Sequence, residues 1–328
     1  MDYECLHTMT ERKKAQWETF LHRCGIDSDP GVERTILLWD DGELIAAGSR
    51  QHNVLKCIAV DPARQGEGLT GTLMTHLRQD AFDAGFRHLF LYTKPQNQTM
   101  FSSLFFYPIA KTADVLLMES SRNGIDRFID SLEKPRREGT VGSIVMNCNP
   151  FTRGHRHLIE TAAAQCDWLY VFVLSEDRSF FPAADRMELV RQGTKDLPNV
   201  TVNPTGQYLI SSATFPTYFL KDKAPAADIH CLLDIAVFTR YFVPAFSITR
   251  RYVGTEPFCG VTSRYNEALR THLPAAGVEF CELPRLEQDA TAISASGVRS
   301  LLHKNQPDAL RRLVPDTTFT YLEQHNLI

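Results

Sequence analysis

A threonine, a glycine and a histidine stand close together in the stretch NPFTRGHRHLIE, between an apolar run and a helical pattern. The run covers residues 143–148, and the apolar spacing after it predicts a helix over 154–166. The first turn of a helix exposes unpaired N–H groups and about half a positive charge, so it attracts anions. Gly154 permits close approach to the backbone, and His155 and Thr152 add side-chain donors. These residue types predict a phosphate cradle with donors aimed at a phosphorus centre under attack.

A plainer interpretation of this stretch makes Gly154 a packing residue and the histidines surface residues. The context favours the phosphate cradle, because the motif follows an apolar run and Asn149-Pro150-Phe151, and because it opens an amphipathic helix. A second stretch, ISASGVRSLL, lies near the end of the chain and carries Ser294, Ser296 and Arg299. Taken alone, this stretch would be no more than a capped helix start.

Together the two stretches resemble the two signatures of the nucleotidyltransferase superfamily. NPFTRGHRHLIE is similar to the T-x-G-H signature, and ISASGVR is similar to the second signature, which opens a helix and holds the β- and γ-phosphates. RYVGTEP, residues 251–257, resembles the strand and loop that receive adenine and ribose. The resemblance implies catalytic roles for His155, Thr152 and Arg299, and nucleotide contacts for Asn149, Pro150, Phe151, Gly154, Gly254, Thr255, Ser294 and Ser296.

Three basic residues are weaker candidates for contact with the phosphates or the acyl acceptor. DRMELV, residues 185–190, resembles the Arg-x-x-Met helix of the same superfamily. Arg178 and Arg186 could reach the ligand, but a solvated protein face explains each arginine equally well. Lys221 is a weaker candidate than either.

The second part of the chain alternates strand and helix patterns. Strands are predicted at 143–148, 168–174, 199–203, 251–254 and 278–283, and helices at 154–166, 183–196 and about 296–304. Such alternation predicts parallel pairing, right-handed crossovers and a doubly wound, Rossmann-like sheet. Ligands of such sheets bind beyond the carboxyl ends of the strands. The T-x-G-H stretch comes directly after the first predicted strand and therefore lies at that edge.

The front part of the chain has a different pattern. A helix is predicted over 11–24, a hairpin around Asp41-Gly42, and later strands and helices that together form a mixed sheet with helices on it, an α+β domain. The stretch CIAVDPARQGEGLTGTLMTHLRQDAFDAG resembles motif A of the GNAT acetyltransferase superfamily, with Gly66 and Gly68 at its glycine positions and Ala63 as a departure. The resemblance implies a site for a phosphopantetheine-type arm. Acetyl transfer and a purely structural role are the alternatives.

Length and composition fit two domains of a soluble protein. The chain has 328 residues, 43% hydrophobic and 23% charged, with a net charge of −4 that argues against a general nucleic-acid or membrane-surface role. We predict domains over residues 1–138 and 139–328. No apolar run approaches the roughly 18 residues of a membrane span, and the start is not a secretion signal. The eight scattered cysteines predict reduced thiols and a cytoplasmic location.

Over essentially its whole length, the chain is similar to the citrate lyase ligase family. The similarity rests on MNCNPFTRGHRHLIE, ISSATFPTYFLK and ISASGVR, in this order behind a GNAT-like front. It implies that ATP, acetate and the free-thiol form of citrate lyase yield acetyl-citrate lyase, AMP and pyrophosphate through acetyl-adenylate. The thiol would belong to a dephospho-coenzyme-A-like group on the lyase's acyl carrier subunit. Mg²⁺ would be bound through the phosphates, with no metal ligand from the protein.

Three rival functions stay open at this point. The signatures permit an adenylyltransferase acting on a phosphate-bearing precursor of coenzyme A or of a nicotinamide nucleotide. The front domain permits a GNAT acetyltransferase that uses acetyl-CoA. A carrier-binding module with an inactive pocket is the third. The apolar, aromatic residues 205–250 have no assigned role, and neither do Asp234 and Arg240 within them.

Overall fold

The computed structural model describes residues 1–135, 138–177, 179–209, 215–220, 226–256, 260–288, 291–304 and 306–328. The chain divides into two compact units. The first comprises Met1–Ile125 with Thr214–Ala236, and the second comprises Asp126–Ala213 with Val237–Ile328. The domain boundary at residues 138 and 139 stays a prediction. Arg178 and Lys221, two of the weaker phosphate candidates, lie outside the described residues.

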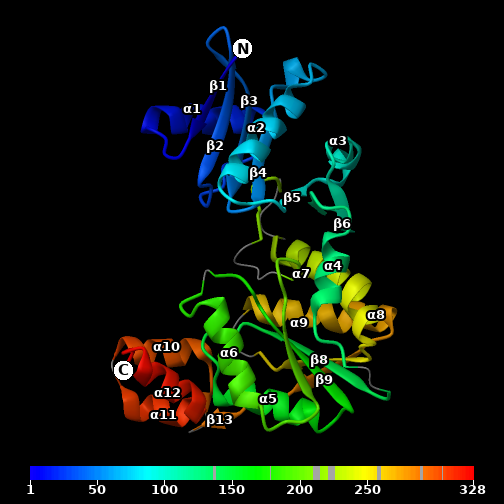
Figure 1. Ribbon diagram of the computed structural model, residues 1–328, viewed down its shortest axis with the longest axis vertical. Coiled ribbons are helices and arrows are strands. Elements are labelled where there is room, and N and C mark those ends of the chain that lie inside the picture. The colour runs from blue at the N-terminus through cyan, green and yellow to red at the C-terminus, as the bar shows by residue number, and fades with distance from the viewer. Residues whose placement is uncertain are drawn as a thin grey trace. The chain divides into compact units, whose positions relative to one another are not determined.

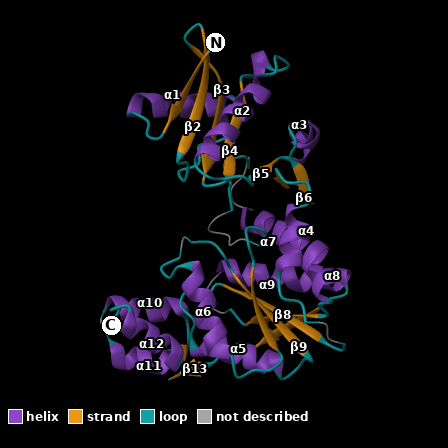
Figure 2. Cartoon of the chain, viewed as in Figure 1, coloured by secondary structure: helices purple, strands orange, loops and turns teal. Residues whose placement is uncertain are grey.

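The first unit is built on a seven-stranded mixed sheet in the order β1-β2-β3-β4-β5-β7-β6 (Figures 1 and 2). Its strands are β1 (Asp2–Leu6), β2 (Arg34–Asp40), β3 (Glu43–Gln51), β4 (Val54–Val60), β5 (Phe90–Thr93), β6 (Tyr107–Lys111) and β7 (Leu116–Glu119). Neighbours run antiparallel except β4 and β5, which are parallel. This parallel pair is in register only at Val54–Phe90 and Leu55–Leu91, among the residues described. Beyond these positions a cavity lies between the two strands.

The helices of the first unit cover this sheet. They are α1 (Glu11–Arg23), α2 (Leu69–Asp83) and α3 (Gln98–Ser103), with short 3-10 turns at Pro62–Arg64 and Pro95–Asn97. The buried face of α2 includes Leu73, Met74 and Leu77 and packs into the main core. A Cβ at Gly48 in β3 would lie 2.7 Å from Leu77 Cδ1, so glycine permits this close packing. The predicted α+β front domain is confirmed.

The second unit contains a five-stranded sheet in the order β10-β9-β8-β11-β12, and all neighbouring strands are parallel. The strands are β8 (Val141–Met146), β9 (Trp168–Val173), β10 (Val200–Pro204), β11 (Arg250–Gly254) and β12 (Glu279–Leu283). Chain order therefore reverses between β8 and β11, which are neighbours in space. In a doubly wound sheet this switch point opens a crevice at the carboxyl ends of the strands. The predicted Rossmann-like architecture is confirmed.

Helices of the second unit lie against this sheet and beyond it (Figure 1). Their bounds are α5 (Arg153–Ala163), α6 (Ala183–Thr194), α8 (Val243–Phe246), α9 (Gly260–His272), α10 (Ala295–His303), α11 (Pro307–Leu313) and α12 (Asp316–Gln324). Helix α5 packs on the sheet through Ile159, Ala162 and Ala163. Helices α10–α12 share a separate apolar cluster that includes Val298, Leu310 and Leu322. Two further helices are α4 (Gly124–Ser131) and α7 (Ala226–Val237).

One apolar helical stretch corrects the expectation that no segment is long enough for a membrane span. Asp228–Phe246 has 19 residues and meets that criterion by length and composition. Within this helical stretch, 56% of an 18-residue segment is buried inside the protein. A core helix of a soluble protein meets the same criterion, so this stretch is weak evidence for a membrane location.

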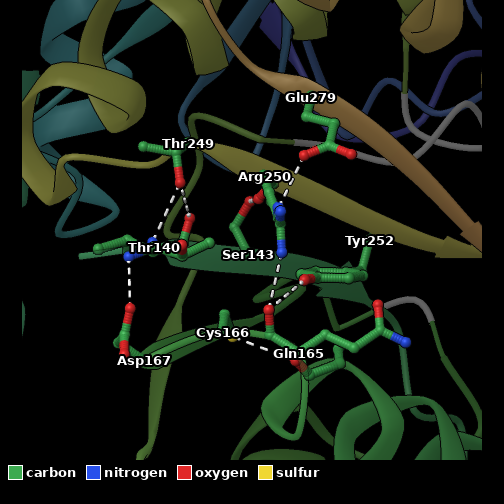
Figure 3. Close-up of polar contacts among 11 residues, drawn as sticks. Thr140, Ser143, Gln165, Cys166, Asp167, Thr249, Arg250, Tyr252 and Glu279 are labelled. Carbon is green, nitrogen blue, oxygen red and sulfur yellow. Dashed lines mark hydrogen bonds and ion pairs between the residues drawn. The ribbon is translucent and has the colours of Figure 1, made fainter.

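Polar contacts fix the amino ends of the parallel strands, at the edge opposite the crevice (Figure 3). The Asp167 carboxylate accepts from the Thr140 N–H at 2.6 Å, and the Thr249 hydroxyl accepts from the Val141 N–H at 3.1 Å. The Arg250 Nε donates to Glu279 at 2.7 Å, and its Nη1 donates to the Gln165 carbonyl at 2.8 Å (Figure 3). These contacts join β8, β9, β11 and β12 in one register, so the opposite ends also lie together.

Arg186 holds together the loops at the carboxyl ends of the parallel strands. It is fully buried and donates to the carbonyls of Phe181, Asn147, Leu174 and Glu176, as well as to the Asn147 side chain. These carbonyls belong to the loops that follow β8 and β9. Neither expectation for Arg186 fits this position, because its guanidinium binds backbone oxygens and does not lie on a solvated face.

Replacing Arg186 by methionine, which has a similar length, removes all of these donors and leaves several carbonyls buried without partners. We expect Arg186→Met to lower the free energy of unfolding in urea by about 3 kcal/mol. The control is Arg191→Met on the exposed face of the same helix, with an expected change within about 0.5 kcal/mol. Equal effects of the two substitutions would show that the carbonyl contacts of Arg186 contribute little.

Candidate functional site

The joint between β8 and α5 is fixed by a reciprocal pair of hydrogen bonds. Thr152 is the N-cap of α5, with an extended backbone, and its hydroxyl accepts from the His155 N–H at 3.3 Å. His155 Nδ1 in turn accepts from the Thr152 N–H at 3.1 Å. This is a capping box in which a histidine takes the place of the usual Glu or Gln. The local sequence T-R-G-H therefore both starts the helix and orients the imidazole.

The capping box also assigns the tautomer of His155. Because Nδ1 accepts a hydrogen bond, the proton of the neutral ring lies on Nε2, which is then a donor. The ring lies parallel to that of Phe151, with centroids 6.1 Å apart and an interplanar angle of 11°. Burial, with a smaller contribution from the positive charge of Arg285, lowers the pKa of His155 from 6.5 to about 4. At neutral pH the site thus presents an uncharged imidazole with one oriented N–H.

His155 lines a cavity of about 430 Å³ in the second unit. The cavity lies at the carboxyl ends of β8, β11 and β12, where the doubly wound sheet predicts a ligand. The predicted site residues that line it are Gly154, His155, Gly254, Ser294, Ser296 and Arg299. Residues from both signatures and from the β11 loop therefore share one space.

The two signature turns contact each other directly. Arg299 Nη1 donates to the carbonyl of Asn149, a residue that is 150 positions away in the chain. A Cβ at Gly154 would lie 3.0 Å from the carbonyl oxygen of Ile293, which explains why glycine stands there. Ser294 caps α10 by accepting from the Gly297 N–H at 3.0 Å, and its hydroxyl lies 3.1 Å from that of Ser296. Two helix N-termini, those of α5 and α10, therefore adjoin the same cavity.

Five of the residues predicted for the nucleotide site are not among the described residues that line the cavity. Asn149 binds Arg299 through its carbonyl and the Phe181 N–H through its side chain, at 3.0 Å for the latter. Pro150 follows a cis peptide bond, and Phe151 is fully buried against Gly193. Thr152 is 1% exposed and orients His155. Thr255 accepts from the Nε of Arg285 through its carbonyl at 2.6 Å.

Three charged residues that line the cavity were given no role from the sequence, namely Arg251, Glu256 and Arg285. Arg285 and Glu256 both line it and form an ion pair. Glu256 follows β11 and Arg285 follows β12, so each stands at the carboxyl end of a parallel strand. That position is a signal that sequence reasoning could have used. Glu256 lies within the RYVGTEP stretch but was not singled out there, and Arg285 lies outside the matched stretches.

The first unit contains a cavity of its own, of about 520 Å³. Gly66 and Gly68 line it, both with positive φ, and Gly68 is the N-cap of α2. Its walls include the separating ends of β4 and β5, and Tyr218 and Phe219 from the later segment of the same unit. The Tyr218 hydroxyl donates to the Tyr92 carbonyl at 3.4 Å, and the backbone carbonyl of Tyr218 accepts from the Asp27 N–H at 2.8 Å.

Comparisons with known proteins agree with this geometry. Residues 141–322 match the model of the citrate lyase ligase C-terminal domain. Residues 3–102 match that of the acetyltransferase (GNAT) family. A citrate (pro-3S)-lyase ligase of Escherichia coli (strain K12) is 43% identical over 95% of this chain and 91% of its own.

The chain belongs to the citrate lyase ligase family. One relative is a citrate (pro-3S)-lyase ligase of Klebsiella pneumoniae, which is 43% identical over 94% of this chain and 92% of its own. Another relative is that of Haemophilus influenzae, 38% identical over 96% and 97% of the two chains. The resemblance identified from the two signatures and the GNAT-like front is confirmed. Membership of this ligase family implies the use of ATP.

The shifted pKa of His155 gives a direct spectroscopic prediction. We expect its imidazole resonances to titrate with a midpoint at pH of about 4, so the ring stays neutral at pH 7. The unfolded ring would titrate near 6.5, so the unfolded state binds the extra proton first and folding stability falls as the pH drops from 6.5 towards 4. Histidine NMR with His155→Gln for assignment measures the midpoint. A value near 6.5 would mean that the ring is solvated.

Proposed function

We propose that this protein is an AMP-forming ligase that activates acetate with ATP and acetylates the prosthetic-group thiol on the acyl carrier subunit of citrate lyase. The observation that carries the proposal is the contact between the two signature turns at one cavity. Family membership supports the reaction class, and the cavity of the second unit supplies the donors for ATP.

In the first half-reaction a carboxylate oxygen of acetate attacks the α-phosphorus of ATP. A new P–O bond forms, the bond between the α-phosphorus and the bridging oxygen breaks, and pyrophosphate leaves with the electron pair. The Nε2–H of His155 donates to an oxygen of the reacting phosphate and stabilises the charge that develops there. Thr152 contributes by holding the imidazole in this tautomer and orientation. Catalysis is thus positioning and electrostatics, without a protein nucleophile.

The second signature receives the pyrophosphate that leaves. The N-terminus of α10 offers backbone N–H groups, and Ser294, Ser296 and Arg299 add side-chain donors at the cavity wall. Gly254, the last residue of β11, leaves room for the adenosine, and Thr255 beside it holds Arg285.

Mg²⁺ enters with the triphosphate in this proposal. The described residues contain no group of three or more His, Cys, Asp or Glu that could hold a metal ion. Phosphate oxygens and water would therefore be its ligands, which suits the preference of Mg²⁺ for oxygen and its reluctance to dehydrate. The ion would neutralise part of the triphosphate charge.

In the second half-reaction the carrier thiol attacks the acetyl carbonyl of acetyl-adenylate, and AMP leaves. The cavity of the first unit is the site that we propose for the carrier's phosphopantetheine-type arm. Gly66 and Gly68 open the N-terminus of α2 to a phosphate, and the apolar strand ends of β4 and β5 flank the extended arm. Tyr218 and Phe219 close part of its wall. The partner is thus the acyl carrier subunit of the citrate lyase complex.

A cytoplasmic location fits the cysteines. The cysteines that the structure describes are free thiols (Cys5, Cys24, Cys57, Cys148, Cys166, Cys231 and Cys281). Reduced thiols are typical of the cytosol, where ATP and an acyl carrier are also available.

The proposal is tested with ATP, labelled acetate and deacetylated citrate lyase. We expect labelled carrier subunit together with AMP and pyrophosphate, and we expect His155→Gln to reduce the rate by about 10²-fold or more. His157→Gln on the same helix, which does not line the cavity, is the matched control and should keep the rate within about threefold.

Three results would count against this function. Release of ADP would exclude adenylate chemistry, and labelling that needs acetyl-CoA would favour the acetyltransferase alternative. Formation of a dinucleotide from a phosphate-bearing cofactor precursor would favour an adenylyltransferase.

The arm site is tested by calorimetry with dephospho-coenzyme A. We expect Gly68→Ala to weaken its binding by about tenfold or more, equivalent to about 1.4 kcal/mol, and to leave acetate-dependent ATP–pyrophosphate exchange unchanged. Gly85→Ala is the matched control, because Gly85 also has a positive φ, of 88°, and open space around its Cβ position, but does not line the cavity. Equal losses in both variants would assign the effect to backbone strain.

A further inference from the structure

Arg285 is held rigidly at the wall of the nucleotide cavity. Its backbone N–H donates to the Thr255 hydroxyl at 3.3 Å, its Nε donates to the Thr255 carbonyl at 2.6 Å, and its Nη2 pairs with Glu256. Only 27% of the Arg285 side chain and 7% of the Glu256 side chain are exposed. These bonds join the loop after β12 to the loop after β11. They also fix the plane of the guanidinium before any ligand binds.

The contacts of Arg285 use only part of its hydrogen-bonding capacity. A guanidinium has five N–H donors in a fixed fork. Within the described part of the chain, side-chain bonds of Arg285 are recorded from Nε and Nη2 only. The two N–H groups of Nη1 therefore remain for a ligand in the cavity that Arg285 lines. A planar fork of this kind suits a phosphate.

The charge balance of the cavity also favours an anionic ligand. Its charged lining residues are Arg251, Arg285 and Arg299 against Glu256, with His155 neutral at pH 7. Glu256 is paired with Arg285, but the set as a whole carries an excess of positive charge. An anion in this enclosed space would be attracted more strongly than in open solvent.

Arg299 and Arg285 can be assigned to different phosphates of ATP from their places at the cavity wall. Arg299 is bound to the Asn149 carbonyl, beside the N-terminus of α10, which is the place proposed for the pyrophosphate. The side chain of Arg285 lies beside Gly254, since a Cβ there would lie 3.8 Å from Arg285 Cγ, so it borders the part of the cavity proposed for the adenosine. His155 is expected at the phosphate under attack. The α-phosphate is the one next to the adenosine, so Arg285 stands on the side of the cavity where that same phosphate is proposed.

We propose that Arg285 is a further catalytic residue, which binds the α-phosphate of ATP together with His155 and stabilises the charge that develops on it. This inference rests on the proposed function and adds a residue to its site. Thr255 and Glu256 are positioning residues, since they hold the guanidinium. Acetate attacks the same α-phosphorus as before, and no bond other than those already described forms or breaks.

The test compares ATP with the two diastereomers of ATP that carry sulfur on the α-phosphate. The rate measured is acetate-dependent pyrophosphate release, with hydroxylamine present to trap the activated acetyl group. We expect Arg285→Gln to lower kcat by about 10²-fold or more. We also expect the variant to lose most of the wild type's preference for oxygen at one α-position. Arg285→Lys keeps the charge but not the fork, so its kcat and its thio preference should fall between those of the wild type and Arg285→Gln.

Controls separate this contact from a structural role of Arg285. Arg270→Gln, at an arginine that is also paired with carboxylates but does not line the cavity, should leave both the rate and the thio preference unchanged. An Arg285→Gln variant that loses rate but keeps the full thio preference would show that Arg285 only positions the loops. A kcat within about threefold of the wild type would also overturn the proposal.

Failure of the inference is distinguishable from failure of the proposed function. If the wild-type protein releases no pyrophosphate with acetate, the proposed function is wrong. ATP binding measured by calorimetry then decides on Arg285 alone. Affinity at least tenfold weaker in Arg285→Gln than in Arg270→Gln would support the contact, and equal affinities would overturn it.

Discussion

The account of this protein depends on one contact between two turns that are far apart in the chain. The guanidinium of Arg299 binds the carbonyl of Asn149, and the backbone at Gly154 approaches the carbonyl of Ile293 so closely that only glycine fits without displacement. Through this contact two helix N-termini, each with its own capping side chain, adjoin one cavity. The proposed reaction needs both turns. One turn holds the α-phosphate, which is attacked, and the other holds the β- and γ-phosphates, which leave as pyrophosphate.

The parallel sheet is what makes that contact possible. Strands β8 and β11 are neighbours although β9, β10 and several helices separate them in sequence, and their carboxyl ends open on the same side. Arg250 and Thr249 fix the opposite ends, and Arg186 ties together the loops that follow β8 and β9. A buried arginine whose partners are all neutral oxygens is costly unless every donor is used. Its role here is therefore to hold the loops, and the phosphate contacts that we propose involve residues outside this cluster.

Much of this arrangement could be predicted from the sequence. Periodicity located β8, α5, β9, α6 and β10 to within a few residues, and T-x-G-H with its partner signature located His155, Gly154, Ser294 and Arg299 at the cavity. Short edge strands such as β1 and β6, and the terminal helices α11 and α12, were not predicted, because each owes its form to tertiary packing more than to its own pattern. Arg285 was missed for a similar reason. Its importance comes from Thr255 and Glu256, which only the fold brings beside it.

The most direct measurement of the central claim is a crystal structure with α,β-methylene ATP, in which a methylene group replaces the oxygen between the α- and β-phosphates, so that the bond cleaved in the reaction is absent. The account predicts the α-phosphate beside Nε2 of His155 and the terminal phosphates at the N-terminus of α10, with Arg299 still bound to the carbonyl of Asn149. A nucleotide bound outside the cavity of the second unit would contradict it. So would a structure in which the two turns separate and the imidazole faces away from the phosphates.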